Sequence, residues 1–233
     1  MLKDIFIDII NNKKEWLKSK KGNEFEDRFE TSLKRYGFNR RAKEDIDNIL
    51  SSIKKNILDK KSDSLIDNTY ALEDRSMEHC FVCQPYGSQE FPDFLIFASK
   101  KIIPIEIKYS SGKSSKPMWN SNLPKANAIY IFGSYKLSDV TFFLGRDVLS
   151  MEERIELIGF FESNAKRLEE EFRKEMRNKL NNTNYKFDRG FDVYIRIAYE
   201  QNKNINKEAN IDYFSHKDRI KCEENVIEFC ESL

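Results

Sequence analysis

The sequence predicts an α/β core with helical additions at both ends. Apolar residues recur at helical spacing early in the chain, short apolar runs typical of buried strands follow, and a long helical stripe comes after them. The length suits one domain, residues 1–233, in three parts. We expect a helical part over 1–70, a sheet over 80–145, and a helical and strand part over 147–233.

Five helices are expected from the spacing of apolar residues. In one of them Phe25, Phe29 and Leu33 fall at i, i+4 and i+8, and Gly37 is well placed to end the helix. The predicted helices cover residues 2–19, 23–36, 42–58, 151–180 and 217–232.

Short apolar runs predict the strands. The run Ile102–Lys108 follows Asp93–Ala98 after a short polar turn, so we expect these two strands to pair as a hairpin. The polar segment 59–68 is expected to be a loop. The other predicted strands are Phe81–Gln84, Ala128–Phe132, Val140–Leu144 and Phe191–Tyr199.

Composition excludes several classes of protein. With 39% hydrophobic and 34% charged residues, the chain is too apolar and aromatic to be disordered. The net charge of +1 does not demand nucleic acid, but forty Lys and Arg residues can still cluster on one face. We find no secretory signal and no apolar run of about 20 residues, so a cytoplasmic protein without a membrane span is expected.

The predicted strand Ile102–Lys108 has one apolar and one charged face. Because side chains alternate along a strand, its isoleucines at 103, 105 and 107 share a face, whereas Glu106 and Lys108 lie about 7 Å apart on the other. Asp93 opens the preceding strand. Pairing through the turn at Ser99–Lys101 would bring Asp93 near both charged residues.

These residue types suit Mg²⁺ chemistry. Mg²⁺ prefers oxygen ligands and is often held by one or two carboxylates together with waters and substrate phosphate. Asp93 and Glu106 can supply the carboxylates, and the carbonyl of Ile107 a third oxygen. Lys108 can then orient the attacking water or stabilise the transition state. The alternative is an ordinary hairpin whose charges are only solvated.

Pro92-Asp93 is followed by Glu106-Ile107-Lys108, with Glu106 thirteen positions after Asp93. This order resembles the active site of the PD-(D/E)xK nuclease superfamily, which includes most type II restriction endonucleases. The resemblance implies a restriction-endonuclease-like core, with a mixed central sheet flanked by helices. It also implies that Asp93 and Glu106 bind Mg²⁺ and that Lys108 assists the attacking water.

A second segment, KGNEFEDRF (Lys21 to Phe29), resembles the Gly-x-x-Phe-Glu element that many members carry on a helix before the core. The resemblance implies that Glu26 reaches the metal site. Glu24 or Glu30 takes this role if the register differs, and the alternative is an ordinary charged helix face.

The polar segment after Lys108 is expected to meet DNA. Lysines there can hold phosphates, serines can donate hydrogen bonds, and asparagines match the edges of adenine. The alternative is a solvated loop. The candidate DNA-binding residues are Ser110, Ser111, Lys113, Ser114, Lys116, an exposed Trp119, Asn120, Asn122 and Lys125, with Tyr86, Ser88 and Gln89 from the segment before Asp93.

Together these features predict a Mg²⁺-dependent type II restriction endonuclease that cuts double-stranded DNA at a short specific site. A homodimer is expected, because a two-fold protein matches a palindromic site. A cognate DNA methyltransferase is implied by the family alone. The alternatives are a structure-selective repair or junction nuclease of the same fold, and a non-enzymatic module.

The pair Cys80-x-x-Cys83 beside His79 is weak evidence for zinc. A structural zinc site needs four ligands, and the remaining cysteines, Cys222 and Cys230, are poorly spaced on a predicted helix.

Overall fold

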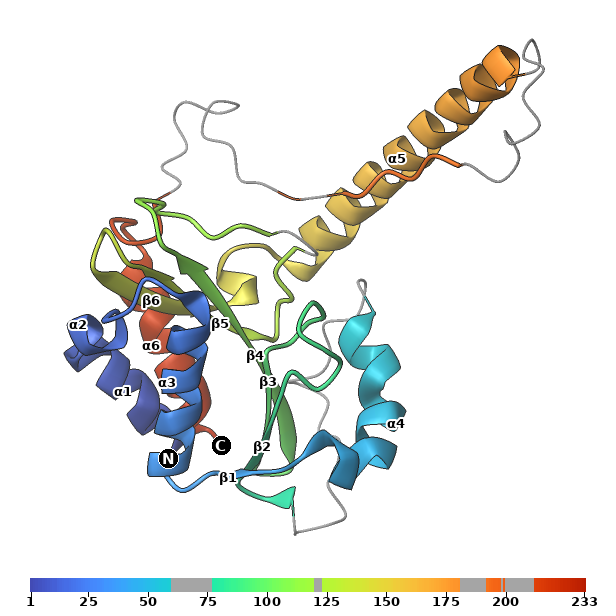
Figure 1. Ribbon diagram of the computed structural model, residues 1–233. Coiled ribbons are helices and arrows are strands. Elements are labelled where there is room, and N and C mark those ends of the chain that lie inside the picture. The colour runs from blue at the N-terminus through green and yellow to red at the C-terminus, as the bar shows by residue number, and fades with distance from the viewer. Residues whose placement is uncertain (60–76, 120–122, 181–191, 198, 200–211) are drawn as a thin grey trace.

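A computed structural model describes residues 1–59, 77–119, 123–180, 192–197, 199 and 212–233. These residues form an α/β fold around a mixed sheet of six strands, in the order β1-β2-β3-β4-β5-β6 (Figure 1). The β1–β2 and β4–β5 pairs are parallel, and the other neighbours are antiparallel. The strands are β1 (Asn39–Arg40), β2 (Cys80–Cys83), β3 (Phe94–Ala98), β4 (Lys101–Ser110), β5 (Ile129–Ser134) and β6 (Asp139–Leu144).

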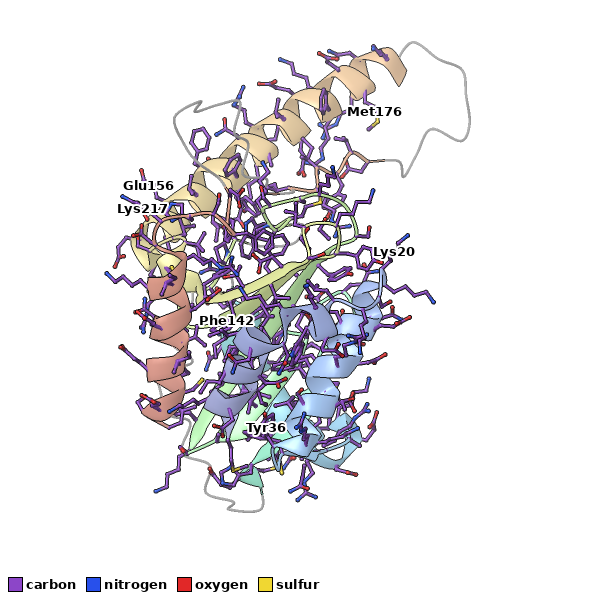
Figure 2. All side chains as sticks on the ribbon, turned by 90° about the vertical axis from the view of Figure 1, so that its left-hand side faces the viewer. Lys20, Tyr36, Phe142, Glu156, Met176 and Lys217 are labelled. Atoms are coloured by element: carbon purple, nitrogen blue, oxygen red, sulfur yellow. The ribbon has the colours of Figure 1, made fainter. Side chains whose placement is uncertain are left out.

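Helices cover both faces of the sheet (Figures 1 and 2). One face carries α1 (Leu2–Asn11), α2 (Lys13–Trp16), α3 (Gly22–Arg35) and α6 (Arg219–Glu231), and the other carries α4 (Asp47–Leu58). The long helix α5 (Met151–Leu180) projects away from this core. Short 3₁₀ helices lie at Lys43–Ile46 and Gly145–Asp147.

The larger core lies between the sheet and the helices α1, α3 and α6. Aromatic pairs join these layers: the rings of Phe29 and Phe94 lie 5.1 Å apart, and those of Phe6 and Phe142 lie 4.8 Å apart. Burying each such side chain contributes about 1.5–3 kcal/mol to stability. The apolar stripes of α1 and α3 therefore fix both helices on this face.

The hairpin between β3 and β4 sets the register of the sheet. Phe94 lies opposite Ile105 and Ala98 opposite Lys101, which confirms the predicted pairing. The two turn residues, Ser99 and Lys100, have positive φ angles of 51° and 61°, as a type I′ turn requires. The carboxylate of Glu78 accepts hydrogen bonds from both of their backbone N–H groups.

Some predicted elements differ in the structure. The helix expected over 2–19 is interrupted at Asn12, which ends α1 and precedes α2. The strand expected over Phe191–Tyr199 is wrong over 192–197, which have no regular structure, and Tyr199 forms only a single bridge with Trp119. Phe191 lies outside the described residues, as does all of the predicted loop 59–68 except Asp59.

None of the helices in the described part of the chain is long and apolar enough to cross a membrane.

Candidate functional site

The candidate site lies where β4 changes its pairing partner. Residues Lys101–Ile105 of β4 pair with β3, whereas Ile105–Ser110 pair with β5 on the other side. The sheet therefore opens beside β4 after Ile105. Asp93, one residue before β3, fills the start of this opening: its Oδ2 accepts the backbone N–H of Ile107 at 2.7 Å. Because the N–H and C=O of a strand residue point to the same side, the carbonyl of Ile107 also faces the opening.

Glu106 and Lys108 line the opening from the face of β4 opposite to Ile103, Ile105 and Ile107. The Nζ atom of Lys108 lies 2.7 Å from Oε1 of Glu106, and the two side chains are only 19% and 14% exposed. The second carboxylate oxygen of Glu106, Oε2, is buried and has no hydrogen-bond partner among the described residues. One oxygen of Glu106 thus stays available to a ligand.

Glu26 reaches the same region from α3. The helix begins at Gly22, which lies against the ring of Tyr109, and Phe25 packs on that ring with centroids 5.4 Å apart. Both contacts hold the first turns of α3 at the end of β4. Burial, followed by the negative charge of Glu106, raises the pKa of Glu26, and the nearby amide of Gln84 acts in the opposite direction.

The two alternatives to Glu26 point elsewhere. Glu24 pairs with Lys21 at 3.7 Å. Glu30 pairs with Lys34 and Arg40 at 2.5 and 2.9 Å. Although burial opposes the change, hydrogen bonds from Lys34 and Cys83 hold the pKa of Glu30 below its usual value. Glu26 is therefore the glutamate of the three that interacts electrostatically with the opening.

Negative charge is concentrated at Asp93. Burial, followed by the charge of Glu106, raises the pKa of Asp93 to about 7, and Glu26 adds to the increase. The N–H of Ile107 and the charge of Lys108 act in the opposite direction but do not cancel it. Three carboxylates thus crowd a largely buried space, where a cation would relieve their repulsion.

The segment after β4 differs from the prediction at Trp119. We expected an exposed Trp119, but its side chain is only 2% exposed. Its ring stands over the ammonium of Lys108, 5.9 Å from Nζ to the ring centroid, and packs edge-on against Tyr130. Trp119 therefore lines the site. Because its ring is buried, it has no exposed surface that could contact DNA bases in this conformation.

Lys125 is also placed unexpectedly. Only 3% exposed, it donates hydrogen bonds from Nζ to the backbone carbonyls of Ile57 and Asp59 at the end of α4. The close approach of Gly145 secures the Lys125 segment, because a Cβ atom on this glycine would lie 1.8 Å from the carbonyl oxygen of Lys125. The predicted phosphate contact by Lys125 conflicts with this burial.

Glu106, Lys108, Trp119 and Lys125 share one small cavity of about 20 Å³. This is room for about one water molecule.

The remaining candidate DNA contacts form a mixed group. Ser111, Lys113, Ser88 and Gln89 are exposed. Asn120 and Asn122 lie outside the described residues. The half-buried members are Ser110, Ser114, Lys116 and Tyr86. Ser110 accepts a hydrogen bond from the N–H of Gly112, and Ser114 donates one to the carbonyl of Lys116. Tyr86 donates to the carbonyl of Leu50.

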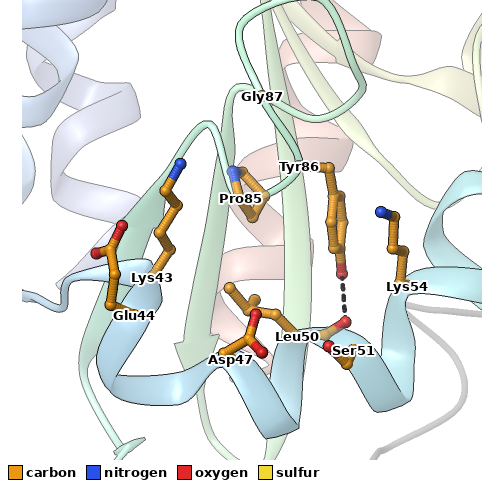
Figure 3. A pocket seen from close by; sticks show the side chains of 9 residues that line it. All are labelled: Lys43, Glu44, Asp47, Leu50, Ser51, Lys54, Pro85, Tyr86 and Gly87. Carbon is orange, nitrogen blue, oxygen red and sulfur yellow. Dashed lines mark hydrogen bonds between the residues drawn. The ribbon is translucent and has the colours of Figure 1, made fainter.

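A separate surface pocket of about 490 Å³ lies between α4 and the segment before Asp93 (Figure 3). Lys43 and Lys54 line it together with Glu44 and Asp47, so its charges balance. Neither Glu106 nor Lys108 lines this pocket. Its features do not identify a ligand.

Comparisons with protein-family models, with curated proteins and with solved structures found no match to this chain.

Within the described residues, no group of three or more His, Cys, Asp or Glu side chains is arranged to hold a metal ion. A metal at the opening would therefore need backbone and water oxygens besides the carboxylates. The unpaired Oε2 of Glu106 and the crowded charge at Asp93 fit such a cation. The sequence carries no signal for Gln84, which belongs to no recognisable pattern, and sequence reasoning assigned Lys125 to DNA phosphates rather than to the carbonyls at the end of α4.

Proposed function

We propose that this chain is a Mg²⁺-dependent endonuclease of the PD-(D/E)xK superfamily, with a restriction-endonuclease-like core, that hydrolyses phosphodiester bonds in double-stranded DNA. The observation that carries the proposal is the hydrogen bond from the N–H of Ile107 to Asp93 at the point where β4 leaves β3. It brings together two carboxylates, a backbone carbonyl and a lysine that are separated by up to fifteen positions in the sequence.

Each side chain has a role that its surroundings support. Asp93 and the free oxygen of Glu106 would hold Mg²⁺ together with the carbonyl of Ile107, and Glu26 would act through a water or directly. When bound, Mg²⁺ polarises the scissile phosphate and lowers the pKa of a coordinated water. Lys108, held between Glu106 and the ring of Trp119, presents its ammonium to the water and to the charge that develops on the phosphate.

The substrate we propose is a short specific, palindromic DNA site, as for a type II restriction endonuclease. The exposed Ser111 and Lys113 follow the catalytic strand and can meet the DNA backbone, with Ser88 and Gln89 on the preceding segment. A cognate methyltransferase belongs to this proposal through the family resemblance alone. The alternative is a structure-selective repair or junction nuclease, which would use the same chemistry without a fixed sequence.

The test is a digest of a large unmethylated linear DNA by the purified chain, with Mg²⁺ or with EDTA. Sharp bands in Mg²⁺ alone support a sequence-specific nuclease, and sequencing their ends gives the site. Lys108→Ala is the matched control for a contaminating nuclease, because that variant should bind the DNA without cutting it.

Two other outcomes redirect the proposal. A smear, or cleavage confined to flaps and junctions, favours the alternative nuclease. Intact linear, flap and junction DNA in every lane contradicts nuclease activity and favours a non-enzymatic module.

A further inference from the structure

The long helix α5 carries an apolar stripe that is partly exposed to solvent. Leu157, Phe161, Leu168 and Phe172 are 37%, 40%, 37% and 48% exposed. Their spacing of four, seven and four residues places them on one side of the helix. Figure 2 shows α5 extending beyond the core between the labelled Glu156 and Met176.

Another side of α5 is already occupied. Residues 192–197 run along it (Figure 1), with the N–H of Ile195 donating to Glu169 and Arg173 pairing with Asp192 at 2.7 Å. Near the base of the helix, Ile158 is fully buried against the sheet. The stripe lies mainly beside these surfaces, and of its four residues Phe161 also packs edge-on against Tyr199, with ring centroids 5.4 Å apart.

The stripe has a two-fold pattern. Leu157 and Phe172 lie equally far from the midpoint between Asn164 and Ala165, and so do Phe161 and Leu168. If a second α5 lies antiparallel across this midpoint, Leu157 faces Phe172 of the other copy, and Phe161 faces Leu168. The four contacts span about 22 Å of helix.

The charges of α5 favour the antiparallel direction. The first half, 151–165, carries four glutamates and one arginine, whereas the second half, 166–180, carries six basic and four acidic residues. Antiparallel copies set the acidic half of one against the basic half of the other. Parallel copies would bring like charges together.

We infer that α5 is a homodimer interface, in which a second copy of this chain packs antiparallel on the stripe of Leu157, Phe161, Leu168 and Phe172. The inference goes beyond the proposed function and does not depend on it, because it rests on the surface of α5 alone. It gives a location to the homodimer expected for a palindromic site. The interface is small, so a dissociation constant in the micromolar range is expected.

The first test is sedimentation equilibrium of the full chain at 1–200 µM, at 0.1 M salt. The wild type should pass from monomer to dimer over about this range. Leu168→Glu should weaken the dimer about 100-fold, because two-fold symmetry introduces the charge at two contacts. The matched control is Ile220→Glu: Ile220 is an apolar residue that is more exposed, at 68%, but it lies on α6 and not on the stripe. It should leave the equilibrium within about threefold of the wild type.

Crosslinking tests the direction. Cysteines at Leu157 and Phe172 in the same chain should form a disulfide between copies under mild oxidation, whereas Leu157→Cys alone should not. Self-crosslinking by Leu157→Cys alone would contradict the antiparallel arrangement. A chain that stays monomeric throughout, or a dimer indifferent to Leu168→Glu, would overturn the inference. None of these measurements depends on DNA cleavage, so a failed digest leaves them interpretable.

Discussion

Two lysines line the same small cavity, and their surroundings give them opposite roles. Lys108 pairs with the carboxylate of Glu106 and remains 19% exposed. Lys125 is buried and donates to the backbone carbonyls of Ile57 and Asp59. A lysine that binds carbonyls at a helix end supports the fold, whereas a lysine beside a half-buried carboxylate is available for chemistry. We therefore expect substitutions of Lys108 and Lys125 to separate activity from stability.

The largest effect is expected for Lys108→Ala. If Lys108 stabilises the charge that develops on the phosphate, single-turnover DNA cleavage should fall about 1000-fold while DNA binding persists. The melting temperature should also fall by several degrees, because the largely buried carboxylate of Glu106 loses its partner. Cleavage within tenfold of the wild type would remove Lys108 from the mechanism.

Lys125→Met should show the reverse. Methionine preserves much of the apolar volume but leaves the two carbonyls without their donor, which costs about 3 kcal/mol in the free energy of unfolding. Urea denaturation measures this loss, and cleavage per folded molecule should stay within about threefold of the wild type. Unchanged stability together with lost cleavage would instead show that Lys125 serves the site.

Asp93→Asn sharpens the comparison by removing the negative charge that Lys108 only partly balances. The pKa of Asp93 is about 7 in the folded chain, above its value when unfolded, so the folded state binds the proton more tightly. The carboxylate therefore costs stability, and the cost grows as the pH rises from about 4 through 7. Without Mg²⁺, the variant should melt roughly 5 °C above the wild type at pH 8 and near it at pH 4.

That variant should also lose cleavage, because the amide is a poor metal ligand. A melting temperature at pH 8 equal to or below that of the wild type would contradict the crowding of charge at the opening.

The smallest effect is expected for Glu26→Gln. Glu26 touches the site through charge and through Gln84, so cleavage should fall about tenfold rather than vanish. Glu24→Gln, two positions away and paired with Lys21, is the matched control and should cleave normally. Equal losses in both variants would show that the charge of the helix, rather than Glu26, matters.

Residues in strongly patterned segments could be predicted from the sequence. The hairpin of β3 and β4 followed from apolar runs and a polar turn, and the positions of Asp93, Glu106 and Lys108 on it followed from strand alternation. The edge strand β1 was missed, because its two residues are exposed and carry no apolar alternation.

Burial set by distant partners could not be predicted. Trp119 stands in a polar segment, and its ring is buried by distant residues such as Tyr130 and Phe143, while its backbone forms a bridge with Tyr199. Lys125 is likewise satisfied by carbonyls more than sixty positions earlier in the chain. No local pattern encodes such contacts.

The two-residue turn at Ser99 and Lys100 also limits how this chain can vary over evolution. One residue added or lost between Asp93 and Glu106 would shift the pairing and turn one of the two carboxylates toward the apolar core. Lengthening each strand by one residue preserves the pairing and both faces. Related chains should therefore differ in the distance between these two acids by even numbers, unless a bulge restores the register.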